Sequence, residues 1–121
     1  MIVIAMFLSV NAFSQSYMTI HAIKIDNGAW RLCKPEIVAE MTKTRITIYS
    51  EQTQRYTVLW VLVQRSIENG DGETSVTWYC SDSRGINCNV TLGVIGSDSR
   101  GEYLSVEYSD HSWIYRGYPK R

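Results

Sequence analysis

The chain has 121 residues and a formal net charge of zero, with twelve Lys and Arg against twelve Asp and Glu. This length suits one domain. A balanced charge provides no long-range field to attract phosphate backbones or anionic membranes, which argues against nucleic-acid binding. A charged fraction of 20% and an aromatic fraction of 12% are typical of a folded domain and not of a disordered chain.

The N-terminal residues differ from the rest, because no charged side chain precedes Lys24. Residues 1–10 form an apolar run that is too short to span a bilayer but fits the apolar core of a secretory signal peptide. Ala12 and Ser14 supply the small residues that a signal peptidase reads. We therefore expect a signal segment at 1–14, one domain at 15–121, and a secreted or periplasmic protein without a stable membrane span after cleavage. The positively charged leading region is missing, so a buried first strand or helix over residues 2–10 is the alternative.

From residue 18 onward, runs rich in Ile, Val, Thr, Tyr and Trp are separated by clusters of Asn, Gly, Asp and Ser, which is the pattern of strands and hairpins. This pattern predicts an all-β antiparallel meander of about eight strands. We expect it to close as a small barrel or barrel-like sandwich, because an open sheet would leave one face and two edges unsatisfied. The expected runs are 18–25, 29–33, 37–41, 45–49, 56–67, 74–81, 86–95, 103–108 and 113–116, and the run 37–41 could instead form one helical turn.

Turn sequences indicate which strands pair. Asn27-Gly28 and residues 69–72 supply side chains that tolerate positive φ, as tight hairpins require. The sequence SDSRG occurs at 81–85 and again at 97–101, and a Gly that ends such a turn suits a type I turn with a bulge.

A three-residue loop in each copy of SDSRG fixes a strand register. The predicted pairs are Cys80–Cys88, Trp78–Val90 and Val76–Leu92 from the first copy, and Val94–Val106 and Leu92–Tyr108 from the second. A shift of one residue would turn these apolar side chains outward. The predicted buried face contains Val76, Trp78, Cys80, Cys88, Val90, Leu92, Val94, Leu104, Val106 and Tyr108.

The three cysteines allow at most one intramolecular disulfide. Cys80 and Cys88 are the candidates, because cross-strand neighbours can have a suitable Cβ separation and export would expose them to an oxidising compartment. Two buried thiols are the alternative. Cys33 is interpreted as a small buried side chain. The Cys-x7-Cys spacing lacks the close spacing of zinc knuckles, so we predict no metal and no cofactor.

The segment Ser109-Asp110-His111-Ser112 contains the residue types of a hydrolytic triad. Such triads are assembled from separated segments, and consecutive side chains on one loop do not relay a proton in that way. The chain also lacks a Gly-x-Ser-x-Gly motif. We therefore predict no catalytic residue and interpret this segment as a polar turn. A small hydrolase that uses Asp110 and His111 is the alternative.

Two resemblances add to this interpretation. Gly28-Ala29-Trp30 resembles the Gly-x-Trp motif of lipocalins and implies a carrier of a small apolar ligand. More of the chain is similar to small, uncharacterised exported proteins of Bacteroidetes bacteria, which implies export and a β fold without a known activity. The residues that carry this second resemblance are AFSQ at 12–15, RITIYS at 45–50, WYC at 78–80, Gly85 and Cys88.

Aromatic residues suggest a function in binding, because tyrosine and tryptophan on a rigid sheet suit contact with protein or carbohydrate. The candidates are Trp30, Tyr79, Tyr103, Trp113 and Tyr115. We expect a non-enzymatic binding or interaction module whose partner is a protein, a glycan or a small apolar ligand. A structural subunit that assembles through the exposed edge beside the apolar run 56–63 is a further hypothesis.

Overall fold

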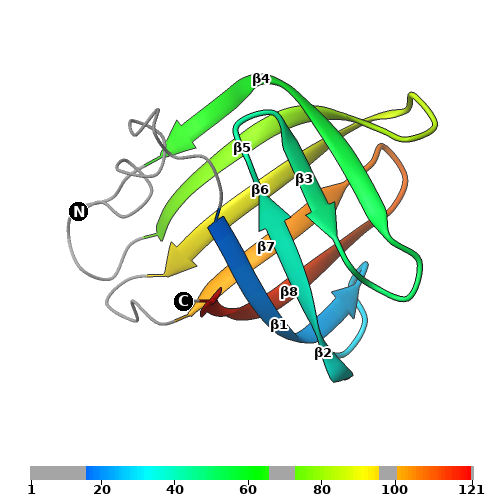
Figure 1. Cartoon of the computed structure of the whole chain (residues 1–121), viewed down its shortest axis with the longest axis vertical. Coiled ribbons are helices and arrows are strands. Elements are labelled where there is room, and N and C mark those ends of the chain that lie inside the picture. The colour runs from blue at the N-terminus through cyan, green and yellow to red at the C-terminus, as the bar shows by residue number, and fades with distance from the viewer. Residues whose placement is uncertain (1–15, 66–72, 96–100, 121) are drawn as a thin grey trace.

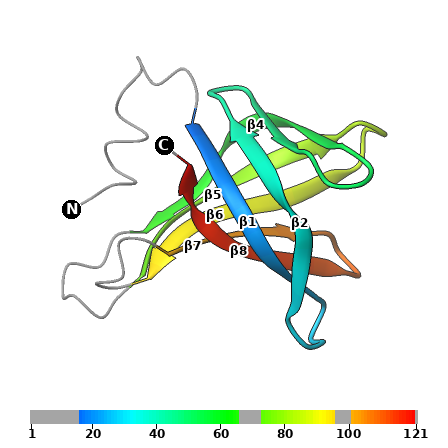
Figure 2. The ribbon, with the colours of Figure 1, turned by 60° about the horizontal axis from the view of Figure 1, so that its bottom comes forward.

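A computed structural model describes residues 16–65, 73–95 and 101–120. These residues form eight antiparallel strands, each paired with its neighbour in the chain, and the last strand pairs with the first to close a barrel (Figure 1). Figure 2 shows the closing strand β1 between β2 and β8. The predicted all-β meander barrel is therefore confirmed. The strands are β1 (Ser16–Ile25), β2 (Arg31–Met41), β3 (Arg45–Ile48), β4 (Gln54–Arg65), β5 (Glu73–Asp82), β6 (Asn87–Ile95), β7 (Glu102–Glu107) and β8 (Ser112–Lys120).

Nine expected runs become eight strands, because residues 29–33 and 37–41 belong to the single strand β2. Pro35 suggests a break, since proline lacks the N–H that a strand ladder uses. In the structure, Pro35 lies at a register shift between β2 and β1, between the pairs Ala22–Leu32 and Ile20–Ile37. The alternative of a helical turn over 37–41 is wrong. The expected signal segment and the turn at 69–72 lie outside the described residues.

The register predicted for the first SDSRG copy is confirmed. Cys80 pairs with Cys88, and the turn between their strands has Gly85 at φ 83°. The Gly85 N–H donates to the Asp82 carbonyl and the Asp82 N–H donates to the Ile86 carbonyl, each at 2.9 Å. This is the predicted turn, in which glycine occupies the left-handed position without a steric cost.

The register predicted for the second copy is wrong. Val106 pairs with Val90 instead of Val94, four residues earlier in β6, and Leu92 pairs with Leu104. The connection between β6 and β7 is therefore longer than the three residues assumed, and most of it lies outside the described residues. Because the displacement is an even number of residues, the apolar side chains remain on the inner face.

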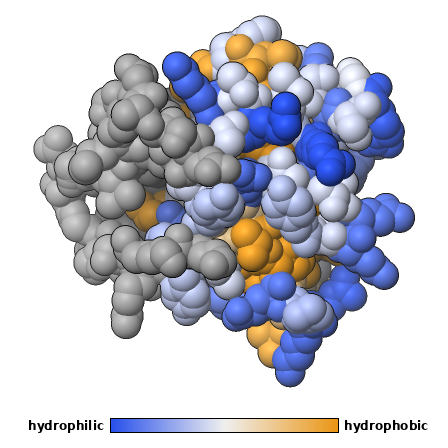
Figure 3. All heavy atoms as spheres, in the orientation of Figure 1, coloured by the Kyte–Doolittle hydropathy of each residue, from blue (hydrophilic) through white to orange (hydrophobic). Residues whose placement is uncertain are grey.

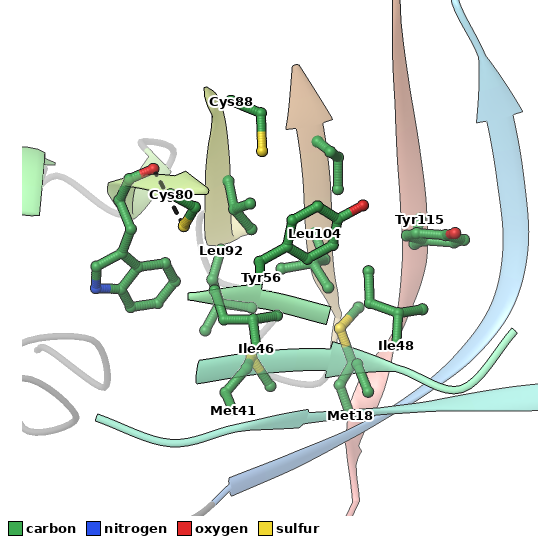
Figure 4. Close-up of a cluster of buried hydrophobic side chains, with 14 of the residues drawn as sticks. Met18, Met41, Ile46, Ile48, Tyr56, Cys80, Cys88, Leu92, Leu104 and Tyr115 are labelled. Atoms are coloured by element: carbon green, nitrogen blue, oxygen red, sulfur yellow. Dashed lines mark hydrogen bonds between the residues drawn. The ribbon is translucent and has the colours of Figure 1, made fainter. Parts of the chain in front are cut away.

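Apolar side chains from all eight strands fill the interior of the barrel (Figure 4). In β1 and β6 they alternate with less buried residues, as the two-residue period of a strand requires. The buried members of this core are Met18, Ile20, Ala39, Met41, Ile46, Ile48, Tyr56, Val76, Trp78, Cys80, Cys88, Val90, Leu92, Leu104, Val106 and Tyr115.

The second half of β4 is an uncovered part of the barrel wall. The short strand β3 pairs with β4 only over residues 54–57, so beyond Val58 the described part of the chain offers β4 a partner only in β5. There, Leu59, Trp60, Val61 and Leu62 are 44–56% exposed in succession. Figure 3 shows apolar side chains at the surface over β4, at the top of the view. Such an edge combines free backbone groups with apolar area.

Candidate functional site

One end of the barrel opens into a hollow of about 870 Å³, within the range of small-molecule sites. The loops β1–β2, β3–β4, β5–β6 and β7–β8 surround it, on the right in Figure 1. We call this hollow the mouth site. The side chains of its inner wall are Gln54, Tyr56, Tyr108, Trp113 and Tyr115.

The period of the strands directs these side chains inward. In β8, Trp113 and Tyr115 lie opposite the buried Val106 and Leu104 of β7, so the two aromatic residues face the interior. In β4, Tyr56 is buried, and it lies opposite Asp82 of β5. Rigid strands, and not loops, therefore carry most of the inner wall.

Gln54 connects two of the phenol rings. The Tyr56 hydroxyl donates to Gln54 Oε1 at 2.7 Å, and Gln54 Nε2 donates to the Tyr115 hydroxyl at 2.8 Å and to Ser50 Oγ at 2.9 Å. Figure 4 shows the rings of Tyr56 and Tyr115 in the same interior space. Burial raises the pKa of both tyrosines, so the phenols are neutral over the physiological range. The inner wall is a neutral aromatic surface with fixed polar groups.

Asp82 anchors the other side of the mouth site. Its side chain is only 7% exposed, and it accepts hydrogen bonds from the Tyr108 hydroxyl at 2.7 Å, from Arg84 Nη2 at 3.0 Å, and from the backbone N–H groups of Arg84 and Ile86 at 2.9 Å. Burial by itself raises the pKa of Asp82, but these hydrogen bonds outweigh it and hold the pKa well below its usual range. Burial and the bond to Asp82 raise the pKa of Tyr108. The carboxylate therefore ties the β5–β6 turn to the aromatic wall.

Three rings form a stack at the rim. The rings of Tyr108 and His111 are nearly parallel, with centroids 4.7 Å apart, and His111 stacks on Trp113 at 5.7 Å. Offset stacks of this kind fix ring orientation. The rings of Tyr108 and Trp113 lie 5.8 Å apart and are tilted by 34°, so the three rings form one aromatic cluster at the rim.

The Asp110–His111 pair does form, although the two residues are consecutive. Asp110 Oδ1 lies 2.6 Å from His111 Nδ1, and both side chains are exposed, at 82% and 45%. His111 lowers the pKa of Asp110. Within the described ranges, the hydrogen-bond partner of the His111 ring is Asp110 and not a serine or cysteine.

The predicted disulfide is not present. Cys80 and Cys88 lie opposite each other as predicted, but both are free thiols, and Cys33 is free as well. The Cys80 thiol instead lies 3.8 Å from the Trp78 carbonyl. Burial raises the pKa of Cys80 to about 12 and that of Cys88 to about 11, which suppresses the thiolate through which a disulfide forms. The alternative of two buried thiols describes this structure.

Of the five aromatic candidates, only Trp113 and Tyr115 belong to the mouth site. Trp30 ends the β1–β2 loop, and two cations lie over its ring: Lys24 Nζ and Arg116 Cζ are each 5.4 Å from the ring centre. It is therefore already engaged by its neighbours.

The other two candidates, Tyr79 and Tyr103, lie on the outer wall of the barrel. Tyr79 stacks on Trp60 at 4.8 Å, and the Tyr103 ring lies so close to Gly93 that an added Cβ would be 2.5 Å from it. Tyr79 and Tyr103 therefore contact other residues of the barrel wall, and neither of them lines the mouth site.

Sequence reasoning assigned no binding role to Gln54, Tyr56, Asp82 and Tyr108. Gln54 lies between the expected runs 45–49 and 56–67, and Asp82 belongs to the SDSRG turn motif. The inward parity of Asp82 beside Cys80 and Trp78 was a usable signal, because a carboxylate on a buried face needs several donors.

No family model, curated protein or solved structure matches the chain. The described residues contain no group of three His, Cys, Asp or Glu side chains that could hold a metal ion. They also contain no helix that is long and apolar enough to cross a membrane. Fold and site thus define a small up-and-down barrel whose mouth combines an aromatic inner wall with charged side chains around it.

Proposed function

We propose that this protein is an exported, non-enzymatic binding module that takes up a small planar molecule at the mouth of its barrel. The observation that carries the proposal is the mouth site itself: a hollow of about 870 Å³ whose inner wall holds three tyrosines, a tryptophan and one amide. Concave sites with apolar walls and a few fixed polar groups are typical of small-molecule binding.

The packed interior supports a shallow site and not a deep lipocalin-like cavity. Met18, Ile48 and Leu104 fill the barrel beneath the mouth and are fully buried. A ligand therefore rests on the layer formed by Tyr56 and Tyr115 instead of passing into the barrel. Export is part of the same proposal, and the small residues Ala12 and Ser14 after the apolar run support it.

Binding of 2-naphthoate, a planar probe, tests the proposal. Thr53 lies in the β3–β4 loop at the rim of the mouth site, so Thr53→Trp should obstruct entry. Lys43 lies in the exposed turn between β2 and β3, at the opposite end of the barrel, and Lys43→Trp is the matched control. Titration calorimetry should show one binding site in the wild type and in Lys43→Trp, and at least tenfold weaker binding in Thr53→Trp.

Equal affinity in all three proteins would place the probe elsewhere and contradict the proposal, as would the absence of binding to the wild type. Thermal unfolding should be cooperative and have the same midpoint in the three proteins, which excludes binding to a partly unfolded chain.

A second candidate function is assembly with another copy of this chain through β4. The exposed run from Leu59 to Leu62 and the edge without a β3 partner favour it, because antiparallel pairing of two such edges would place apolar residues opposite one another. In that case Val61→Lys should convert a dimer into a monomer in sedimentation analysis, with little loss of stability at this exposed position. A wild-type chain that is monomeric at high concentration would rule this function out.

A further inference from the structure

A second hollow lies on the outer wall of the barrel, beside the mouth site. It has a volume of about 540 Å³, which is within the range of small-molecule sites. It extends from Tyr79 of β5 across β6 to the β7–β8 loop, and we call it the outer groove. The outer groove and the mouth site meet at the rim, where both contact Asp26, Tyr108 and His111.

Tyr79 forms one end wall of the outer groove. Its ring stacks on Trp60 of β4, with centroids 4.8 Å apart, and its cross-strand neighbour on the other side is Asn89 of β6. Because Trp60 and Asn89 flank Tyr79 on opposite sides, the ring face that Trp60 leaves uncovered is directed toward the groove. A ring that is held in this way is a platform for the apolar C–H face of a sugar ring.

Polar side chains follow Tyr79 across the outer groove. Asn89 pairs with Glu107 of β7, and Asn87 lies two residues from Asn89 on β6, so all three project from the outer face of the sheet. Within the described ranges, these three side chains form no hydrogen bond with the protein. Amides donate and accept, and a carboxylate accepts, so the set matches neighbouring hydroxyl groups, each of which is both a donor and an acceptor.

The charges of the outer groove disfavour an anionic ligand. Its carboxylates are Asp26, Glu107 and Asp110, its imidazole belongs to His111, and the described residues that line it include no Lys or Arg. A phosphate, sulfate or carboxylate ligand would therefore meet like charges. The described residues also contain no group of three ligands that could hold a metal ion. A neutral molecule with several hydroxyl groups fits this charge pattern best.

We propose that the outer groove is a second binding site of this protein and that its ligand is a neutral carbohydrate. One sugar ring packs on the uncovered face of Tyr79, and its hydroxyl groups form hydrogen bonds with Asn87, Asn89 and Glu107. All four residues lie on strands, so the site is formed before the ligand arrives. This site is separate from the mouth site and adds to the proposed function.

Titration of the wild type with six short oligomers, followed by nuclear magnetic resonance, tests the class of ligand. The neutral probes are cellotriose, maltotriose, mannotriose and triacetylchitotriose, and the charged probes are trigalacturonate and trilysine. At least one neutral probe should bind and shift the side-chain amide signals of Asn87 and Asn89, which are identified by their absence in Asn87→Ser and Asn89→Ser. The proposal is overturned if no neutral probe shifts these signals, or if either charged probe binds more tightly than every neutral one.

Variants locate the bound sugar. Tyr79→Val removes the platform and should weaken binding of the tightest neutral probe about tenfold. Tyr118→Val is the matched control, because Tyr118 is also an outward tyrosine of a strand and stacks on one ring, that of His21, at 5.2 Å, but does not line the outer groove. Tyr118→Val should bind like the wild type.

Glu107→Gln provides a second variant, at an exposed position where the fold tolerates the change. Loss of the charged acceptor should weaken binding of the same probe about fivefold. Wild-type affinity in both Tyr79→Val and Glu107→Gln would show that the sugar binds elsewhere and would overturn the inference. Thr53→Trp should leave sugar binding unchanged, and Tyr79→Val should leave 2-naphthoate binding unchanged, so failure of the outer groove and failure of the mouth site are distinguishable.

Discussion

Replacing Asp82 by Asn is expected to lower the free energy of unfolding by about 2 kcal/mol, the cost of weakening charge-assisted hydrogen bonds to a buried group. An amide can still accept from the backbone through its oxygen, but the amide nitrogen that replaces the second oxygen accepts neither the Tyr108 nor the Arg84 hydrogen bond. The tyrosine hydroxyl would then lose its acceptor inside the mouth site. Urea unfolding followed by circular dichroism measures the loss.

This loss should depend on pH in a defined direction. The folded pKa of Asp82 lies below the unfolded value of about 3.9. Its contribution is therefore fully present above about pH 5 and is lost as pH falls through the folded pKa. The difference in stability between the wild type and Asp82→Asn should stay constant above about pH 5 and become smaller below about pH 4.

Ser83→Ala changes the exposed neighbour in the same turn and should alter stability by less than about 0.5 kcal/mol. If Asp82→Asn were as stable as this control, or if the difference between wild type and Asp82→Asn grew toward acid pH, the carboxylate would not be the anchor of the mouth site.

The two copies of SDSRG show what a turn motif can predict and what it cannot. The first copy predicts the register of β5 and β6, because Gly85 requires the left-handed position that only one loop length provides. The second copy carries the same letters but connects β6 and β7 in another register. A turn motif is a local preference, and pairing along whole strands can override it. The prediction of which side chains face inward was still correct, because it depends on the apolar pattern of the strands and not on the length of the loop.

The mouth site was less accessible to sequence reasoning, because its residues come together only when the barrel closes. Gln54 and Tyr115 are 61 positions apart in the chain, yet they share a hydrogen bond of 2.8 Å. Trp113 and Tyr115 were proposed for binding as exposed aromatic residues, and the structure places both on the inner face. Strand parity alone cannot distinguish the two faces where aromatic residues occupy both, as in the segment from Trp113 to Tyr118.

Gly117→Ala is expected to lower the stability of the fold strongly, because β8 approaches β1 closely at this residue. Gly117 pairs with Ile20 and faces β1, and a Cβ at this position would lie 1.8 Å from the Thr19 carbonyl oxygen and 2.9 Å from the Ile20 Cα. These are backbone atoms, so no side chain can move aside. The seam that closes the barrel would have to separate, at a cost of about 3 kcal/mol or more. Thermal and urea unfolding measure this loss.

Two other glycines provide controls that separate crowding from backbone strain. An Ala at Gly85 meets no atom within 4 Å but must adopt φ 83°, which costs about 1 kcal/mol. For an Ala at Gly93, the three nearest atoms belong to the end of the Tyr103 ring, a side chain that can move away from the wall. We therefore expect Gly117→Ala to be the most damaging of the three. If its loss equalled that of Gly85→Ala, the β1–β8 seam would be adjustable, and barrel closure would not depend on the absence of a side chain at this position.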